Sequence, residues 1–316
     1  MMKKRRLGRT DIEITPIGLG TWQLSEGRGF NKYFWPEISQ DIADGIIKAA
    51  IDGGINWFDT AEAYGSGRSE RDLSSALVKA GIGSGEAVIA TKWWPLFRTS
   101  RSISSTIDVR LKYLSPFSID LYQIHNPFSF ASIAAQMNAM ADLVESGKIH
   151  AVGVSNFSAK MMRKAHDVLM RRGIPLASNQ VRYNILARNP ESNGVLETAK
   201  ELGITIICYS PLEFGLLTGK FHRDPDLLQS RPFARRKIMA KRIASSMRII
   251  KVLEEIAEAR GATISQVALS WLVNFNGDMV VAIPGASKPK HAEESAGAMK
   301  VALSPEEMDR IDRVSR

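Results

Sequence analysis

Short apolar runs alternate along the chain with longer segments in which apolar residues recur at helical spacing. The apolar runs have the length of buried strands and cover residues 17–20, 55–59, 87–91, 118–125, 151–155, 176–180, 204–210 and 279–285. The segments between them follow helical patterns. In residues 39–52, Ile42, Ile46 and Ala50 share one face before Gly53 ends the pattern, and Thr263 with Gln266 has the spacing of a capping box. The pattern predicts eight strand–helix units.

This alternation predicts a parallel sheet, because strands joined through helices run in the same direction. The strands mostly lie about 30 residues apart, which is the size of one strand–helix unit. A doubly wound dinucleotide fold would require Gly-x-Gly-x-x-Gly after the first strand, but residues 18–23 read GLGTWQ and lack the third glycine. We therefore expect an α/β protein in which residues 1–316 form a single (β/α)8 barrel.

Two segments add to the expected barrel. Residues 4–14 form two short alternating runs around Gly8, which predicts an N-terminal β-hairpin covering the barrel floor. Residues 211–278 form a long connection between strands seven and eight. Connections of more than about 12–15 residues are uncommon unless they are functional or partly helical.

Composition places the chain among ordinary soluble proteins, with 44% hydrophobic and 24% charged residues. The net charge is +9, and basic residues cluster at residues 3–6, 171–172 and 231–242. We interpret the first two clusters as solvated surface and expect an anionic small ligand near the third. Nucleic-acid binding is not expected, since no aromatic residues interleave with these groups and no known module is present. One cysteine (Cys208), no apolar membrane span and no signal-peptide pattern predict a cytoplasmic protein. No obligate protein partner is evident from the sequence.

Residues with reactive side chains follow the predicted strands. Asp59, Lys92 and His125 end strands two, three and four, and Tyr64 follows Asp59 by five positions. Taken singly, Asp59 could cap a turn and His125 could be a structural histidine. In a barrel these three strand ends are neighbours on the face where active sites form, so we expect the four side chains to share one pocket.

These four side chains are suited to proton transfer. A free tyrosine has a pKa of about 10, and a nearby ammonium lowers it by favouring the phenolate. Asp59 would keep a buried Lys92 charged, and His125 could hydrogen-bond the same substrate oxygen as Tyr64. The five histidines show no metal-ligand spacing, and no nucleophile lies beside a base. A site that polarises a substrate oxygen without a metal suggests reduction of a carbonyl group, with the hydride supplied by a cofactor.

The chain resembles the aldo-keto reductase superfamily over essentially its whole length. The resemblance rests on seven segments in order: GGINWFDTAEAYGSGRSE, IATKWW, IDLYQIHNP, GKIHAVGVSNFS, NQVRYNIL, CYSPLEFGLLTGK and IPGASKPKHAEES. It implies an NADPH-dependent reduction of aldehydes or ketones, with Tyr64 as the proton donor. Lys92 and Asp59 would tune Tyr64, and His125 would orient the carbonyl.

The resemblance also implies a set of residues that bind NADP(H) in an extended groove. These are Thr21, Trp22, Asp59, Ser155, Asn156, Gln180, Tyr209, Ser210, Pro211, Leu212, Gly215, Leu217, Lys220, Gly285, Ser287, Lys288, His291, Glu294 and Ser295. Among them Ser287 and Lys288 would meet the 2′-phosphate. The family more often has Gln or Arg at His291 and Asn at Ser295, so adenine recognition differs here from the family pattern.

Substrate and alternative functions are less constrained by the sequence. We expect an apolar, aromatic substrate pocket formed by Trp22, Tyr33, Trp35, Trp93 and Phe157, which favours carbonyl compounds with apolar bodies. One alternative is a cofactor-binding regulatory subunit of the same fold with little turnover. A second is a (β/α)8 enzyme of unrelated chemistry that uses a bound phosphate.

Overall fold

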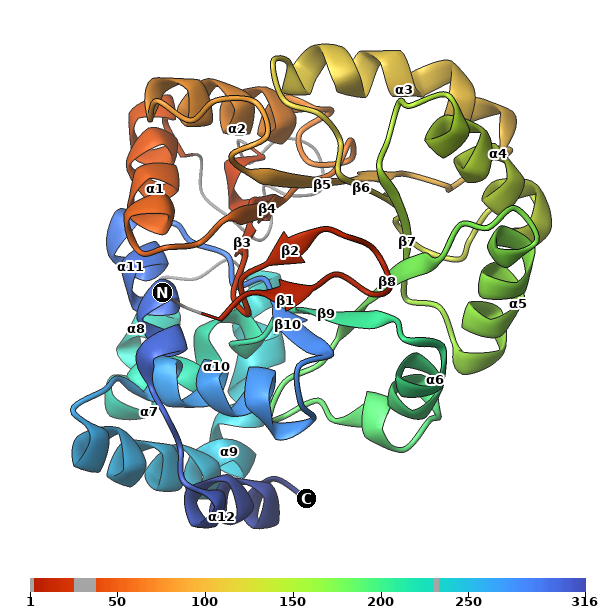
Figure 1. Cartoon of the computed structure of the whole chain (residues 1–316). Coiled ribbons are helices and arrows are strands. Elements are labelled where there is room, and N and C mark those ends of the chain that lie inside the picture. Colours follow the sequence, from red (N-terminus) through yellow and green to blue (C-terminus); the bar gives the residue numbers. More distant parts are fainter. Residues whose placement is uncertain (1–2, 26–37, 230–232) are drawn as a thin grey trace.

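Eight parallel strands form one sheet in the computed structural model, which describes residues 3–25, 38–229 and 233–316. Figure 1 shows the strands at the centre, surrounded by helices. Each strand pairs with the next one in the sequence, so the sheet order follows the chain. The strands are β3 (Leu19–Gly20), β4 (Trp57–Asp59), β5 (Val88–Trp93), β6 (Leu121–Ile124), β7 (Ala151–Ser155), β8 (Leu176–Arg182), β9 (Thr205–Tyr209) and β10 (Val280–Ala282).

The first and last strands meet and close the sheet into a barrel. Parallel bridges join Ile17 to Ala282 and Gly20 to Gly285. The Gly20 amide also donates to the Pro284 carbonyl at 3.1 Å. All eight predicted strands are therefore present, and the predicted (β/α)8 barrel is confirmed.

The N-terminal hairpin is also confirmed. Strands β1 (Arg5–Arg6) and β2 (Glu13–Ile14) pair antiparallel before the barrel begins. Leu7 and Ile14 from this hairpin are buried in the same apolar cluster as Trp57, where β4 begins. The hairpin therefore closes the end of the barrel at which the strands start, and it leaves the other end open for a site.

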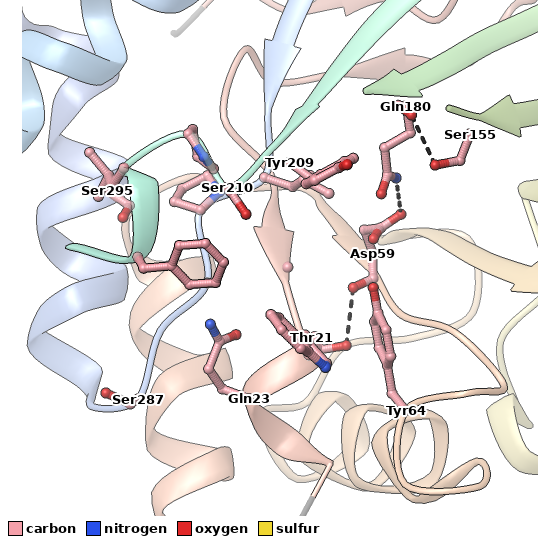
Figure 2. A pocket seen from close by; sticks show the side chains of 18 of the residues that line it. Thr21, Gln23, Asp59, Tyr64, Ser155, Gln180, Tyr209, Ser210, Ser287 and Ser295 are labelled. Carbon is pink, nitrogen blue, oxygen red and sulfur yellow. Dashed lines mark hydrogen bonds between the residues drawn. The ribbon is translucent and has the colours of Figure 1, made fainter. Parts of the chain in front are cut away.

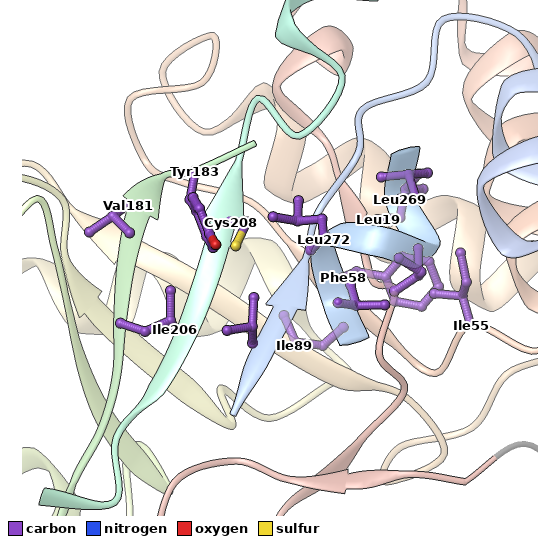
Figure 3. Packing of buried hydrophobic residues seen from close by; sticks show 14 of the residues in the cluster. Leu19, Ile55, Phe58, Ile89, Val181, Tyr183, Ile206, Cys208, Leu269 and Leu272 are labelled. Atoms are coloured by element: carbon purple, nitrogen blue, oxygen red, sulfur yellow. The ribbon is translucent and has the colours of Figure 1, made fainter. Parts of the chain in front are cut away.

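The strands are buried on both faces, as expected for a parallel sheet covered by helices. In β4, Trp57 belongs to the cluster inside the barrel, whereas Phe58 belongs to the cluster between sheet and helices. Asp59 follows with the same inward orientation as Trp57, because side chains alternate along a strand. Figure 3 shows the outer cluster, which contains Phe58 and the wholly buried Cys208.

Helices connect consecutive strands on the outside of the barrel. They are α1 (Gln40–Asp52), α2 (Arg68–Lys79), α3 (Arg101–Leu114), α4 (Ile133–Glu145), α5 (Ala159–Met170) and α6 (Val195–Leu202); α11 (Pro289–Gly297) and α12 (Pro305–Ser315) follow β10. In α1 the buried stripe includes Ala43, Ile46 and Ala50, whereas Ile42 is 42% exposed. Ile46 and Ala50 are thus buried as predicted, whereas Ala43 takes the place of Ile42 in the stripe.

The long connection between β9 and β10 is largely helical. It contains the 3₁₀ segment η4 (Glu213–Thr218) followed by α7 (Lys220–Arg223), α8 (Asp226–Gln229), α9 (Phe233–Arg260) and α10 (Ile264–Phe275). The predicted capping box is present at the start of α10, where Gln266 N donates to Thr263 Oγ1 at 3.2 Å. Within the described parts of the chain, no helix is both long enough and apolar enough to span a membrane.

Candidate active site

A cavity of about 1250 Å³ opens at the carboxyl ends of the strands. It runs from the neighbourhood of Tyr64 and His125 to that of Ser287 and Ser295, and Figure 2 shows most of its length. Ligand pockets typically measure about 300–1000 Å³, so this cavity has room for a large ligand together with a small one.

Lys92 lies at the base of the cavity, between Asp59 and Tyr64. Its ammonium is in direct contact with Asp59 Oδ1 and donates to the Thr60 carbonyl at 2.8 Å. The same Nζ lies 3.4 Å from the Tyr64 hydroxyl. Lys92 is wholly buried, whereas Asp59 and Tyr64 line the cavity. The strand ends thus bring together the acid, the ammonium and the phenol, as the sequence predicted.

Two glutamines complete the surroundings of Asp59. Gln123 Nε2 and Gln180 Nε2 donate to Asp59 Oδ2 at 3.0 and 2.9 Å. Each carboxylate oxygen therefore has partners, which holds the buried Asp59 in one orientation. The sequence reasoning missed Gln123, although it lies two residues before His125 and hence on the same face of the chain.

The pKa values of Lys92 and Tyr64 depend on their burial and on the neighbouring charges. Burial lowers the pKa of Lys92, but the charges of Asp59 and Tyr64 and their hydrogen bonds outweigh it, so that its pKa lies above the usual value and the ammonium stays charged. Burial raises the pKa of Tyr64, while Lys92 opposes that rise. The expectation that Lys92 brings the pKa of the Tyr64 phenol below its ordinary value is therefore wrong for the protein without a bound cofactor. Lys92 instead limits how far burial weakens the acid.

His125 is neutral and is held by aromatic rings. Burial, together with the nearby charge of Lys92, places the pKa of His125 well below its usual value. The imidazole stands edge-to-face against Tyr64 at 5.7 Å and against Trp94 at 5.1 Å between ring centroids. Its Nδ1 is buried and has no hydrogen-bond partner among the described residues. A neutral imidazole beside the phenol can donate or accept a hydrogen bond at a substrate oxygen.

Polar groups line the next part of the cavity along strands β7, β8 and β9. Ser155 Oγ donates to the Gln180 carbonyl at 2.9 Å, and Asn156 Nδ2 donates to Ser155 Oγ at 3.1 Å. Tyr209 donates through its hydroxyl to Asn156 Oδ1 at 3.0 Å. Asn156 has φ of 60°, which turns its side chain away from the strand direction. These four predicted cofactor residues form one connected group.

The far end of the cavity lies at the start of α11. Ser287 and the exposed Lys288 precede this helix, and helix amino ends favour anions. A side chain at Gly285 would place its Cβ 2.2 Å from the amide of Gln23, so the Gln23 side chain would have to move to admit one. Gln23 Oε1 is buried and unpaired in the described structure, which leaves it available to a ligand.

The loop after β9 covers the middle of the cavity. Its lining residues there are Ser210, Pro211, Leu212, Phe214, Gly215, Thr218 and Lys220. Gly215 has φ of 89°, a conformation that other residues rarely adopt. Buried Glu213 in this loop forms ion pairs with Arg182 and Arg242. Arg242 belongs to the basic group at residues 231–242, and it therefore binds a carboxylate of the protein itself. Leu217, predicted to bind cofactor, does not line the cavity and instead packs in the core.

The Aldo/keto reductase family model matches residues 16–316. The chain belongs to the aldo/keto reductase family. The chloroplastic pyridoxal reductase of Arabidopsis thaliana is 31% identical over 321 residues, covering 96% of this chain and 84% of that protein.

Solved aldo-keto reductases share the fold. The thermostable aldo-keto reductase Tm1743, solved in complex with the inhibitor epalrestat, is 32% identical with a TM-score of 0.80, and the match covers 99% of this chain and 100% of that one. An aldo/keto reductase from Klebsiella pneumoniae in complex with NADP and acetate is 26% identical with a TM-score of 0.74, covering 98% and 95%.

The predicted substrate residues of this aldo/keto reductase separate into three groups. Trp22 lines the cavity, with its ring centroid 6.5 Å from that of Tyr64. Trp93 and Phe157 are wrong as pocket residues, since both are buried in the cluster between sheet and helices. Side chains alternate along β5, so the inward orientation of Lys92 turns Trp93 outward. Tyr33 and Trp35 lie outside the described residues.

The sequence reasoning missed a group of charged residues at this end of the cavity. Glu62, Arg98 and Arg110 line it together with Trp94 and Asn126. The described part of the pocket is thus more polar than the expected aromatic one. A carboxylate three positions after Asp59, within the same loop, was the signal in the sequence for Glu62.

Proposed function

We propose that this aldo/keto reductase uses NADPH to reduce aldehydes or ketones to alcohols, with Tyr64 as the general acid. The observation that carries the proposal is the position of Lys92, in contact with Asp59 and 3.4 Å from the phenol at the base of a large cavity. His125 lies against the same phenol and is neutral. Together these groups can bind a carbonyl oxygen and supply its proton.

Each residue has a distinct task in this proposal. Tyr64 transfers its hydroxyl proton to the carbonyl oxygen as the oxygen gains negative charge. Lys92 stabilises the phenolate that remains, and Asp59 keeps Lys92 charged throughout. His125 forms the second hydrogen bond to the substrate oxygen and so orients the carbonyl group.

The cavity fits a nicotinamide dinucleotide phosphate. NADPH, when bound, supplies the hydride. Ser155, Asn156 and Gln180 would hold the carboxamide, and Tyr209 would stack on the nicotinamide ring. The loop residues Ser210–Lys220 would hold the pyrophosphate. Three features support the adenosine end: the unpaired Gln23 Oε1, the absence of a side chain at Gly285 beside Gln23, and the basic residue Lys288 at the start of α11.

The test is NADPH oxidation by the purified protein, followed at 340 nm against a panel of small aldehydes and ketones. Turnover with at least one carbonyl compound is expected. Tight NADPH binding without turnover on any member of the panel would instead support a regulatory subunit. Absence of both binding and turnover would contradict the proposed cofactor site.

A further inference from the structure

A second buried ion network lies directly beside the proposed catalytic group. Glu62 has side-chain exposure of only 10%, and its Oε1 accepts hydrogen bonds from Trp94 N at 2.6 Å and from Arg98 Nη1. Arg98 Nη1 also donates to the Trp94 carbonyl at 3.1 Å. One carboxylate therefore binds both ends of the turn from Trp94 to Arg98.

Two further charged residues support Glu62 from behind. Arg110 Nη1 lies 3.7 Å from Glu62 Oε2 and 3.0 Å from Glu70 Oε2. The other oxygen of Glu70 accepts from the Thr91 hydroxyl at 2.7 Å, on the strand that carries Lys92. Both Arg110 and Glu70 are buried, so this side of the network is shielded from water.

The position of Trp94 matters because its ring contacts His125. The two rings stand at 86° with centroids 5.1 Å apart. The Nδ1 atom of His125, which a carbonyl or carboxylate usually orients, is buried and has no such partner in the described residues. The orientation of the imidazole therefore depends on packing between Tyr64 and Trp94. Glu62, in turn, fixes the backbone from which Trp94 projects.

We infer that Glu62 is a positioning residue, which holds Trp94 against His125 and thereby sets the orientation of the imidazole toward the substrate oxygen. The inference rests on the proposed function, in which His125 orients the carbonyl. It also explains why a carboxylate lies in the short loop between Asp59 and Tyr64, because one loop then aligns the acid and the second hydrogen-bond donor together.

The first test compares Glu62→Ala and Glu62→Gln. Misplacing a catalytic group by about 1 Å can lower turnover about 100-fold, so we expect Glu62→Ala to lower kcat about 10- to 100-fold with an unchanged Kd for NADPH. The amide oxygen of Gln can still accept from Trp94 N, so Glu62→Gln should recover most of the loss. Glu191→Ala is the control, because Glu191 also binds an arginine, Arg188, but does not line the cavity. Glu62→Ala with wild-type kcat would overturn the inference.

A double-mutant cycle separates positioning through Trp94 from general destabilisation. Trp94→Ala retains the backbone amide but removes the ring, so Glu62→Ala should cause little further loss of kcat in that background. Losses that multiply would show that Glu62 acts by another route and would overturn the inference.

The second readout does not depend on turnover. The His125 ring signals in a ¹H–¹³C spectrum, identified by their loss in His125→Asn, should shift in Glu62→Ala and not in Glu191→Ala. If Glu62→Ala does not fold, Glu62→Gln and Trp94→Ala replace it: Trp94→Ala should shift the His125 signals, and Glu62→Gln should leave them near wild type. Unchanged His125 signals in Trp94→Ala would overturn the inference. A wild type that reduces no carbonyl would count against the proposed function alone, since the spectra still test the packing.

Discussion

The Lys92 ammonium lies 3.4 Å from the Tyr64 hydroxyl and 5.0 Å from the centre of its ring. Lys92 is wholly buried and Tyr64 is partly buried at the wall of the cavity, so the charge acts on the phenol with less screening than in bulk water. Because burial already raises the pKa of Tyr64, Lys92 is the group that keeps proton transfer accessible.

Removing Lys92 is therefore expected to impair reduction about as much as removing Tyr64. In Lys92→Met the phenol loses its stabilising charge, and Asp59 keeps only its neutral partners Gln123 and Gln180. We expect kcat to fall about 100-fold or more, since general acid catalysis typically contributes 10²–10⁴-fold. The double variant Lys92→Met, Tyr64→Phe should be little worse than either single one, because residues that act as a unit are not additive. Rate losses that multiply would argue against the coupled pair.

His125 should remain neutral across the neutral pH range. Burial and the charge of Lys92 lower the pKa of its imidazole well below its usual value. Its ring signals in ¹H–¹³C spectra should therefore stay constant as the pH falls from 8 to 6. A half-titration point near pH 6.5 would contradict the described packing around His125.

Glu70 predicts a loss of stability as the pH rises. Burial, partly opposed by Arg110, raises the pKa of Glu70 to about 7 in the folded protein. A carboxyl whose pKa is higher folded than unfolded stabilises the protein fully below the unfolded pKa of about 4.3, and this contribution is lost as the pH passes 7. We expect the free energy of unfolding to fall by up to about 3 kcal/mol between pH 4.5 and 8 from this group.

The measurement is urea unfolding at pH 5 and pH 8 for wild type and Glu70→Gln. The difference in unfolding free energy between the two pH values should be smaller in Glu70→Gln, whatever its stability at either pH. An equal difference in both proteins would show that Glu70 does not titrate in this range.

The start of α11 predicts a preference for NADPH over NADH. Ser287 and Lys288 line the cavity there, and charge-assisted hydrogen bonds contribute about 1.5–3 kcal/mol each. Two such bonds to a 2′-phosphate give a preference of about 100-fold, which added salt should weaken. Fluorescence titration should show this ratio in wild type and its loss in Ser287→Ala, Lys288→Ala. Lys290→Ala is the matched control, because Lys290 is exposed on the same helix but does not line the cavity. Equal affinities for both cofactors in wild type would refute the assignment.

The sequence predicted the strands and their ends well, because apolar runs and strand–helix spacing depend on local pattern. The prediction that Trp93 and Phe157 line the pocket is wrong, although both are aromatic and lie next to site residues. The alternation of side chains along β5 already excluded Trp93, since Lys92 and Trp93 cannot both point inward. The same rule would have favoured Trp94 and Gln123.

Other features depend on contacts that no local pattern contains. The network that joins Glu62 to Arg98 and Arg110 brings together residues from the loop after β4, the loop after β5 and α3. The pKa of Tyr64 likewise depends on a balance between burial and charge, and only the folded structure shows that burial has the larger effect.

The most direct test of the account is Tyr64→Phe, measured for carbonyl reduction and NADPH binding in the same preparation. Removing only the hydroxyl should lower kcat by about 10²–10⁴-fold, because the variant has no group to protonate the carbonyl oxygen. The Kd for NADPH should stay within about twofold of wild type, since the phenol ring and the cofactor residues remain. A variant that keeps more than about a tenth of wild-type turnover would show that Tyr64 is not the acid.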